Sequence, residues 1–308
     1  MPLDSEVREL LKRMERSDPR PRSTWTISET RKKYLQMRTL AGEPKVLERI
    51  KDRTVPGPAG KIPIRLYAAR TGAPLPTLVY LHGGRFISGD LDTHDRVCRD
   101  LAARSGCLIV AVEYRLAPEN QFPAAVEDAF SVASWAAFHG GDAGIDTARI
   151  GVGGDSAGGN LAAAVALLAR DREHPTLRCQ LLIYPMLDAT CGAETHSTYA
   201  AGYGAGSEDM QHGYREYVPE GVDLQNPLVS PLFAGNLTGL PPALIQTAEY
   251  DCLREEADQY GERLRTAGVS VINRRYDGAI HGFFQMAGVL RLGVSAIEEA
   301  SAFLRDAL

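Results

Sequence analysis

The chain has 308 residues, of which 44% are hydrophobic and 24% charged, proportions typical of a globular protein with a sizeable core. A net charge of −5 and a pI near 5.9 leave no basic face, so we expect no nucleic-acid partner. No stretch reaches the roughly 18 continuous apolar residues of a membrane helix, so we also expect no membrane insertion.

The five cysteines are scattered along the chain, and none has C-x-x-C spacing. This pattern favours free thiols in a reducing compartment over a disulfide framework or a zinc site. The first residues also lack the apolar core of a secretory signal. We therefore expect a cytoplasmic protein.

Two helices are expected before the first strand. The first carries apolar residues at helical spacing from Val7 to Met14 and is ended by residues 19–21. The second begins near Ser28, a candidate N-cap, and continues through residues 31–40. Because both helices precede any strand and a proline-rich break separates them, we interpret residues 1–44 as an appendage to the core.

From residue 46 onwards, short apolar runs typical of strands alternate with longer runs of helical character. The expected strands are residues 46–55, 62–68, 77–81, 108–112, 149–152, 180–184, 243–248 and 269–276. The expected helices are residues 93–105, 123–138, 158–170 and 254–267, with a closing helix from about 290. Near-continuous apolar strands separated by helices predict an α/β fold with a mostly parallel sheet covered on both faces.

The alternation breaks between residues 188 and 226, in a stretch rich in Gly, Tyr, His and acidic residues. We expect no strand or strong helix there. An insertion of this length after a strand is more typical of a lid or cap than of a structureless loop. The sequence therefore predicts a cap from residues 1–44 and 188–226 over a core domain from residues 45–187 and 227–308.

Ser156 stands at the centre of the G-x-S-x-G pattern of residues 154–158, between an apolar strand and an alanine-rich helix. A serine on such a sharp strand-to-helix turn has its hydroxyl raised above the sheet edge, where it can act as a nucleophile. The pattern also occurs by chance, and the flanking strand and helix are what favour the nucleophile. A dinucleotide-binding loop is excluded, because the third glycine of G-x-G-x-x-G would fall on Ser156.

The segment His82-Gly83-Gly84-Arg85-Phe86 follows the expected strand 77–81. Its glycines allow backbone N–H groups to turn outward and donate to an oxyanion, as the H-G-G-G motif does in lipases and esterases. The alternative is an ordinary glycine turn.

Asp251 and His281 follow the last two expected strands, and the carboxyl ends of such strands are where ligands bind. Serine is a poor nucleophile unless an imidazole takes its proton and a carboxylate orients that imidazole. Glu249 and Asp277 are rival acids that fit the strand ends less well. The other histidines are expected to have structural roles and not to act as the catalytic base: His94, His139, His174, His196 and His212.

With these motifs in this order, the chain resembles the bacterial hormone-sensitive-lipase family of α/β-hydrolase esterases, in its G-D-S-A-G branch. The resemblance covers about residues 75–285. It also includes the segments Glu113-Tyr-Arg-Leu-Ala-Pro-Glu119, Tyr184-Pro185, Asp251-Cys-Leu-Arg-Glu-Glu256 and Ile280-His-Gly-Phe283. Several spaced motifs in one order are far more specific than any one of them.

The resemblance implies an α/β-hydrolase fold with about eight strands and a helical cap, and no metal or organic cofactor. It implies Ser156 as nucleophile, His281 as base and Asp251 as the residue that orients it. It further implies an oxyanion hole formed by the backbone N–H groups of Gly83, Gly84 and Ala157.

Two residues depart from the family's pattern. Arg85 replaces the third glycine of H-G-G-G, and if this position has φ > 0 an arginine costs about a kcal/mol or more there. Otherwise its guanidinium would reach toward the acyl pocket or pair with a nearby acid. Cys252 stands where the family usually has proline, a change we expect to be benign. Arg115 and Glu119 are expected in a structural network under the site.

The sequence therefore predicts a serine carboxylesterase that hydrolyses short-chain acyl esters of small molecules through an acyl-enzyme intermediate. The candidate substrate-binding residues are Trp25, Arg85, Phe86, Tyr203 and Phe283. The same triad could serve an amidase or deacetylase acting on a specific metabolite. A non-catalytic receptor of the same fold is a further alternative, which the presence of His281 disfavours. Members of the family often pair through an edge strand, here residues 269–276, which would give a homodimer.

Overall fold

The computed structural model describes residues 2–18 and 20–308 and is built around one eight-stranded sheet. The strands lie in the order β1-β2-β4-β3-β5-β6-β7-β8. Their bounds are β1 Arg49–Gly57, β2 Gly60–Ala68, β3 Leu75–Leu81, β4 Leu108–Val112, β5 Ile145–Asp155, β6 Gln180–Ile183, β7 Ala243–Tyr250 and β8 Val271–Ile280. The pairs β1–β2 and β2–β4 are antiparallel, and the other pairs are parallel. This confirms the predicted mostly parallel sheet.

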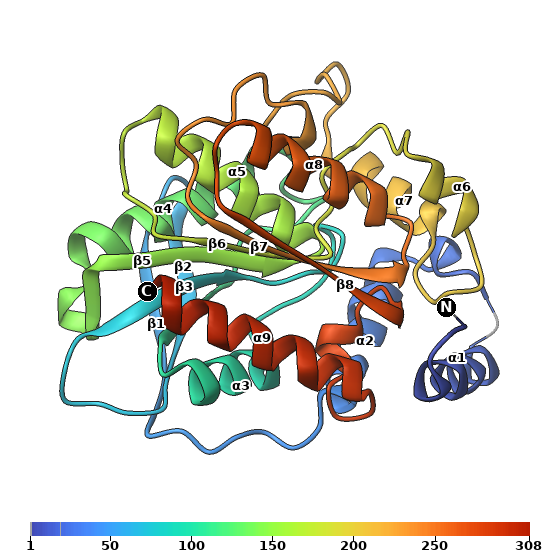
Figure 1. Ribbon diagram of the computed structural model, residues 1–308, viewed down its shortest axis with the longest axis horizontal. Coiled ribbons are helices and arrows are strands. Elements are labelled where there is room, and N and C mark those ends of the chain that lie inside the picture. Colours follow the sequence, from blue (N-terminus) through green and yellow to red (C-terminus); the bar gives the residue numbers. More distant parts are fainter. Residues whose placement is uncertain (1, 19) are drawn as a thin grey trace.

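Helices cover both faces of the sheet (Figure 1). On one face lie α4 (Ala124–His139), α5 (Ala157–Asp171) and α8 (Arg254–Thr266), and on the other α3 (Asp95–Ser105) and α9 (Arg291–Ala307). The core is accordingly divided into two hydrophobic clusters. Because side chains alternate along a strand, Val79 and Leu81 of β3 enter one cluster, while Leu78 and Tyr80 enter the other. Burial on both faces is what makes the central strands almost continuously apolar.

The predicted elements are observed within a few residues, with two informative exceptions. β5 begins earlier and ends later than predicted and reaches the residue before Ser156. β8 continues to Ile280, so that His281 directly follows its end. Both extensions contain glycine and polar residues, which interrupt the apolar pattern from which we predicted the strand limits.

Four helices lie beyond the carboxyl ends of the parallel strands (Figure 1): α1 (Ser5–Ser17), α2 (Ile27–Met37), α6 (Glu194–Thr198) and α7 (Ser207–Tyr217). Our expectation of no strong helix in residues 188–226 was wrong, because α6 and α7 both lie there. α7 buries Met210, Tyr214 and Tyr217, which share one helix face. The spacing of these three residues indicates a helix, but we did not recognise it among the many polar residues around them. The short 3₁₀ turn η1 (Arg22–Thr24) contacts α7.

The N-cap of α2 is Thr26 and not Ser28, which lies inside the helix. The Thr26 hydroxyl accepts a hydrogen bond from the Glu29 N–H (3.2 Å), and the Glu29 carboxylate accepts one from the Thr26 N–H (2.9 Å). This T-x-x-E capping box is recognisable from sequence. α1 ends at Ser17, shortly before residues 19–21, which we expected to end it; of these, Pro19 lies outside the described residues.

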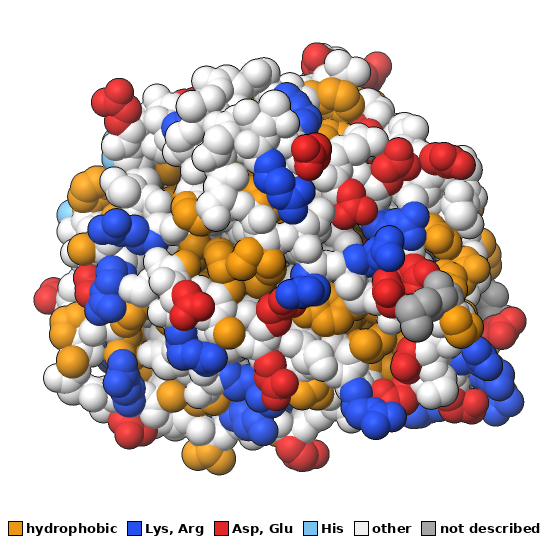
Figure 2. Space-filling model, in the orientation of Figure 1, with side chains coloured by type: hydrophobic (Ala, Val, Ile, Leu, Met, Phe, Trp, Pro, Cys, Tyr) orange, Lys and Arg blue, Asp and Glu red, His pale blue; other side chains and the backbone are white. Residues whose placement is uncertain are grey.

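Acidic and basic side chains are interspersed over the face shown in Figure 2, as expected for a small net charge. Within residues 2–18 and 20–308, no helix is both long and apolar enough to cross a membrane. The cysteines are free thiols, as the sequence predicted, and Cys191 is the least buried of them.

Candidate active site

Ser156 lies between β5 and α5 in a backbone conformation that residues with a side chain rarely adopt (φ 56°, ψ −116°). Neighbouring glycines allow this turn. A Cβ on Gly154 would lie 2.3 Å from the Leu81 carbonyl oxygen, and one on Gly158 would lie 1.9 Å from the same atom. The turn holds the Ser156 hydroxyl at the carboxyl end of β5 and at the N-terminus of α5, the structural context that G-x-S-x-G predicts.

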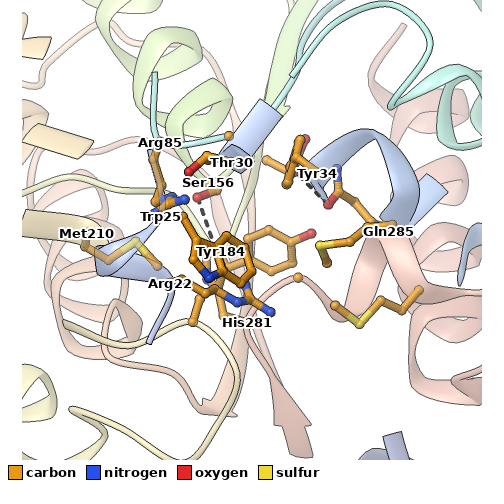
Figure 3. A pocket seen from close by; sticks show the side chains of 16 residues that line it. Arg22, Trp25, Thr30, Tyr34, Arg85, Ser156, Tyr184, Met210, His281 and Gln285 are labelled. Carbon is orange, nitrogen blue, oxygen red and sulfur yellow. Dashed lines mark hydrogen bonds between the residues drawn. The ribbon is translucent and has the colours of Figure 1, made fainter. Parts of the chain in front are cut away.

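His281 and Asp251 reach Ser156 from the ends of β8 and β7. The His281 Nε2 lies 3.1 Å from the Ser156 Oγ, and its Nδ1 lies 2.8 Å from the Asp251 Oδ2. Asp251 is only 1% exposed, and its second oxygen accepts a hydrogen bond from the Leu253 N–H (3.0 Å). A hydroxyl, an imidazole and a fixed carboxylate therefore stand in one hydrogen-bonded line; its Ser156–His281 link is drawn in Figure 3.

The two rival acids point elsewhere. Glu249 accepts a hydrogen bond from a backbone N–H of β8 (2.7 Å), and Asp277 pairs with Arg275 (2.9 Å). Among the histidines of the described chain, His281 alone is hydrogen-bonded to Ser156. The structure thus brings together the three side chains that the sequence singled out.

The Gly83 N–H, one of the three expected oxyanion donors, is already in use. It donates to Asp155 Oδ1 at 3.0 Å. The same carboxylate accepts a hydrogen bond from the Tyr80 hydroxyl (2.8 Å) and lies 3.2 Å from the His94 Nε2. Burial alone would raise the pKa of the Asp155 carboxyl, but His94, Tyr80 and the Gly83 N–H lower it. Contrary to our expectation, Gly83 has no free N–H to offer to an oxyanion.

Three other backbone N–H groups near Ser156 have no acceptor within the described residues: those of Gly84, Arg85 and Ala157. Ala157 is the first residue of α5, where a helix leaves its N–H groups unpaired. Gly84 requires glycine, because its φ is +129° and a Cβ would lie 2.0 Å from the Ser88 carbonyl oxygen. Arg85 has a φ of 58°, a conformation that costs a residue with a side chain about 1–2 kcal/mol.

A small cavity of about 60 Å³ opens in front of Ser156. Its walls come from the strand ends and from the segments beyond them, and they include Arg22, Trp25, Thr30, Tyr34, Arg85, Tyr184, Met210 and Gln285 (Figure 3). Trp25 and Arg85 were expected at the substrate site and do line this cavity. Arg22 was missed, because nothing in a lone arginine of a turn indicates which way it points.

Phe86, Tyr203 and Phe283 do not line the cavity, contrary to our expectation. Phe86 is fully buried and stacks on Tyr217 with 3.9 Å between ring centroids. Phe283 is also fully buried, within the core cluster that contains α9. Tyr203 stacks on Tyr250 at 5.1 Å. Proximity to a motif in sequence does not fix the direction of an aromatic side chain.

Arg85 has the positive φ that we considered, and its side chain nevertheless lies against α7 and faces the cavity, the placements that we expected only without a positive φ. Its Nη1 lies 3.6 Å from the Asp209 Oδ1 and donates to the Asp209 carbonyl oxygen at 3.4 Å. Burial lowers the pKa of the Arg85 guanidinium, and Asp209 opposes this shift. A Cβ on Gly213 would lie 2.7 Å from the Arg85 Cβ, so α7 can approach Arg85 only with glycine there.

Arg115 and Glu119, which we expected in one network, belong to two separate contacts. Arg115 pairs with the buried Asp128 through nitrogen–oxygen distances of 2.8 and 2.9 Å. Glu119 pairs with Arg31 of α2 at 2.6 Å. The second pair ties α2 to the loop after β4, and so helps to fix the helix that forms one wall of the cavity.

A serine on a strand-to-helix turn, with an acid and a histidine from the following strand ends, is the arrangement of an α/β-type serine hydrolase. Comparisons with known proteins agree with this class. A family model described as alpha/beta hydrolase fold matches residues 78–285. The chain therefore belongs to the α/β-hydrolase family, in its hormone-sensitive-lipase-like branch.

The chain is similar to several esterases. It is 40% identical over 266 residues to the carboxylic ester hydrolase LipN of Mycobacterium tuberculosis, covering 83% of this chain and 71% of that protein. It is 34% identical over 284 residues to an arylesterase of Saccharolobus solfataricus, covering 92% of both. The solved structure of a hyperthermophilic esterase from the archaeon Pyrobaculum calidifontis superposes with a TM-score of 0.94, at 40% identity and 99% coverage of both chains. The protein is a carboxylic ester hydrolase.

Proposed function

We propose that Ser156, His281 and Asp251 form the catalytic triad of this ester hydrolase and that it acts on short-chain acyl esters. The observation that carries the proposal is the pair of hydrogen bonds from Ser156 to His281 (3.1 Å) and from His281 to Asp251 (2.8 Å). The distances suit proton transfer from the hydroxyl to the imidazole without rearrangement.

In this mechanism the Ser156 Oγ attacks the ester carbonyl while the His281 Nε2 takes its proton. Asp251 accepts a hydrogen bond from the Nδ1–H, which fixes the tautomer and stabilises the imidazolium. His281 then gives its proton to the departing alcohol, leaving the acyl group on Ser156. A water molecule, activated by His281 in the same way, attacks the acyl-enzyme and releases the acid.

The developing oxyanion is bound by the N–H groups of Gly84, Arg85 and Ala157. Gly83 is left out of this set because its N–H serves Asp155 (3.0 Å). One such donor contributes about 3 kcal/mol to transition-state stabilisation. The positive φ of Arg85 (58°) supports this role, since strained backbone conformations cluster at functional sites.

Residues 1–44 and 188–226 form the cap, and residues 45–187 and 227–308 form the catalytic domain. Both cap segments contribute side chains to the cavity, which supports this division. Arg22 and Trp25 come from the first segment and Met210 from the second. The cavity in front of Ser156 is small, about 60 Å³, and this favours short acyl chains.

Two further proposals concern the protein outside its active site. A cytoplasmic location is supported by the free thiols.

A homodimer through β8 is supported by the position of β8 at one edge of the sheet, where the strand offers unpaired backbone groups. Size-exclusion chromatography with light scattering tests the second proposal, and a monomer at all concentrations contradicts it.

Hydrolysis of p-nitrophenyl esters from acetate to dodecanoate, by the wild type and Ser156→Ala, tests the function. We expect a short-chain optimum that is lost in the variant. An optimum at dodecanoate contradicts the proposed chain length, and full activity of the variant contradicts the nucleophile. A folded wild type that hydrolyses p-nitroanilides but no ester would instead favour the amidase alternative.

A further inference from the structure

Two guanidinium groups line the cavity in front of Ser156. Arg22 comes from η1 and Arg85 from the loop after β3. Both are drawn around Ser156 in Figure 3. An uncharged ester gives these groups nothing to pair with beyond its carbonyl oxygen.

Within the described residues, the nearby carboxylates pair with Arg85 but not with Arg22. Asp209 lies 3.6 Å from the Arg85 Nη1, but it also accepts a hydrogen bond from the Gly206 N–H (3.0 Å). The Arg22 guanidinium has no hydrogen bond or ion pair within the part of the chain that the structure describes. Burial lowers its pKa, and only Asp209 and Tyr34 oppose this shift. Asp155, the carboxylate that lines the cavity, contacts Tyr80, the Gly83 N–H and His94 and forms no ion pair with Arg22.

Two uncharged side chains of the same cavity have unpaired polar atoms. The Trp25 indole N–H and the Thr30 hydroxyl are buried and have no hydrogen-bond partner among the described residues. Thr30 is only 2% exposed. A buried polar group without a partner costs about 1–3 kcal/mol, so both atoms favour a ligand that supplies acceptor atoms.

A second, open cavity adjoins the first and shares Arg22, Trp25 and Met37 with it. The other charged residues that line it are the cations Arg8, Lys12, Arg20 and Lys33 and the anions Glu15 and Asp18. Most of these cations are paired with acids: Arg20 and Lys33 with Asp18, and Lys12 with Glu9. The entrance therefore adds little net charge, and Arg22, which lines both cavities, is its unpaired cation nearest Ser156.

We propose that the preferred substrates of this site are esters that also carry a carboxylate, which Arg22 and Arg85 bind. The planar guanidinium donors match the two oxygens of a carboxylate, and the unpaired Trp25 N–H and Thr30 hydroxyl add further donors to the same cavity. The inference rests on the proposed function, because it assigns a substrate class to the same active site. It narrows that class from short acyl esters in general to anionic ones.

The test compares monoethyl glutarate with ethyl pentanoate, two ethyl esters of five-carbon acids that differ by one terminal carboxylate. Release of acid by the wild type, Arg22→Met, Arg22→Lys and Lys32→Met is followed by pH-stat titration. Lys32 is an exposed cation of α2 that lines neither cavity and serves as the matched control. Arg85 is left unchanged because its backbone belongs to the oxyanion loop.

We expect the wild type to have the higher kcat/KM for monoethyl glutarate. Arg22→Met lowers the glutarate-to-pentanoate ratio of kcat/KM by about tenfold or more, as expected for a lost charge-assisted hydrogen bond. Arg22→Lys retains part of the ratio, and Lys32→Met retains all of it. Circular dichroism verifies that each variant is folded, and the wild-type ratio tests the inference without any variant.

A wild type that hydrolyses ethyl pentanoate and prefers it to monoethyl glutarate overturns this inference and leaves the proposed function intact. A ratio that is unchanged in folded Arg22→Met overturns it as well. A folded wild type that hydrolyses neither these esters nor any p-nitrophenyl ester instead overturns the proposed function.

Discussion

A 3.0 Å hydrogen bond from the Gly83 N–H to the Asp155 carboxylate joins the loop after β3 to the end of β5. The proposed oxyanion donor Gly84 follows the first of these residues, and the proposed nucleophile Ser156 follows the second. The bond therefore fixes the donors relative to the nucleophile. Because the carboxylate is also held by Tyr80 (2.8 Å), this junction is part of the packed core.

Replacing Asp155 by alanine should cost both stability and activity. The change leaves Gly83, Tyr80 and His94 without their shared partner inside the core. We expect a loss of about 3–5 kcal/mol in the free energy of unfolding, and a lower kcat because the oxyanion loop is released. Urea unfolding and hydrolysis of p-nitrophenyl butyrate measure the two effects. Wild-type stability in Asp155→Ala would contradict the role of the junction.

Gly158→Ala should disturb the turn that holds Ser156. Its Cβ would lie 1.9 Å from the Leu81 carbonyl oxygen, which is backbone and cannot move aside cheaply. We expect a loss of about 1–3 kcal/mol or more in the free energy of unfolding, together with a lower kcat. Gly141→Ala is the control, because a Cβ there meets no atom within 4 Å. Equal effects of the two substitutions would argue against the close contact.

Asp251→Asn should lower kcat by a factor on the order of 10⁴, because an amide no longer fixes the productive tautomer of His281 or stabilises its imidazolium. The matched control is Asp277→Asn, a change in the exposed carboxylate that pairs with Arg275. This control should keep activity close to that of the wild type. If Asp277→Asn were instead the more damaging of the two, the assignment of the orienting acid would be wrong.

Acid should destabilise the protein partly through His82. Burial and the neighbouring His94 lower the pKa of His82 to about 3, from an ordinary value of 6.5. Between these values the unfolded chain binds a proton that the folded chain does not. Stability contributed by His82 is therefore present above about pH 6.5 and falls as the pH drops toward 3, by at most about 1.4 kcal/mol per pH unit.

Urea midpoints from pH 7 to pH 4, for the wild type and His82→Phe, measure this contribution. The variant retains an aromatic ring against Tyr114, on which His82 stacks at 4.2 Å between centroids. We expect the variant to lose less stability over this pH range than the wild type. Parallel pH profiles would show that His82 does not titrate as described.

The sheet and the triad were predictable because their signals are local. Each buried strand is a short apolar run, and Ser156, Asp251 and His281 each follow such a run within a few residues. Since parallel strands end at one edge of the sheet, their terminal residues meet there regardless of the details of packing. The Thr26–Glu29 capping box carried an equally local signal.

The rest of the site depends on contacts between distant segments. Gly83 is removed from the oxyanion hole by Asp155, which lies 72 positions further along the chain. Phe86 is turned into the core by its positive φ (64°), where it meets Tyr217 of α7. Arg22 reaches the cavity only because η1 contacts α7. No pattern within one segment contains this information.

The most direct measurement is the reaction of the folded protein with a fluorophosphonate, followed by peptide mapping with mass spectrometry. Such reagents label serines that an adjacent base has activated. We predict one adduct, on Ser156, in the wild type, no adduct in Ser156→Ala and strongly slowed labelling in His281→Ala. An adduct on another residue, or equally fast labelling without His281, would contradict the proposed triad.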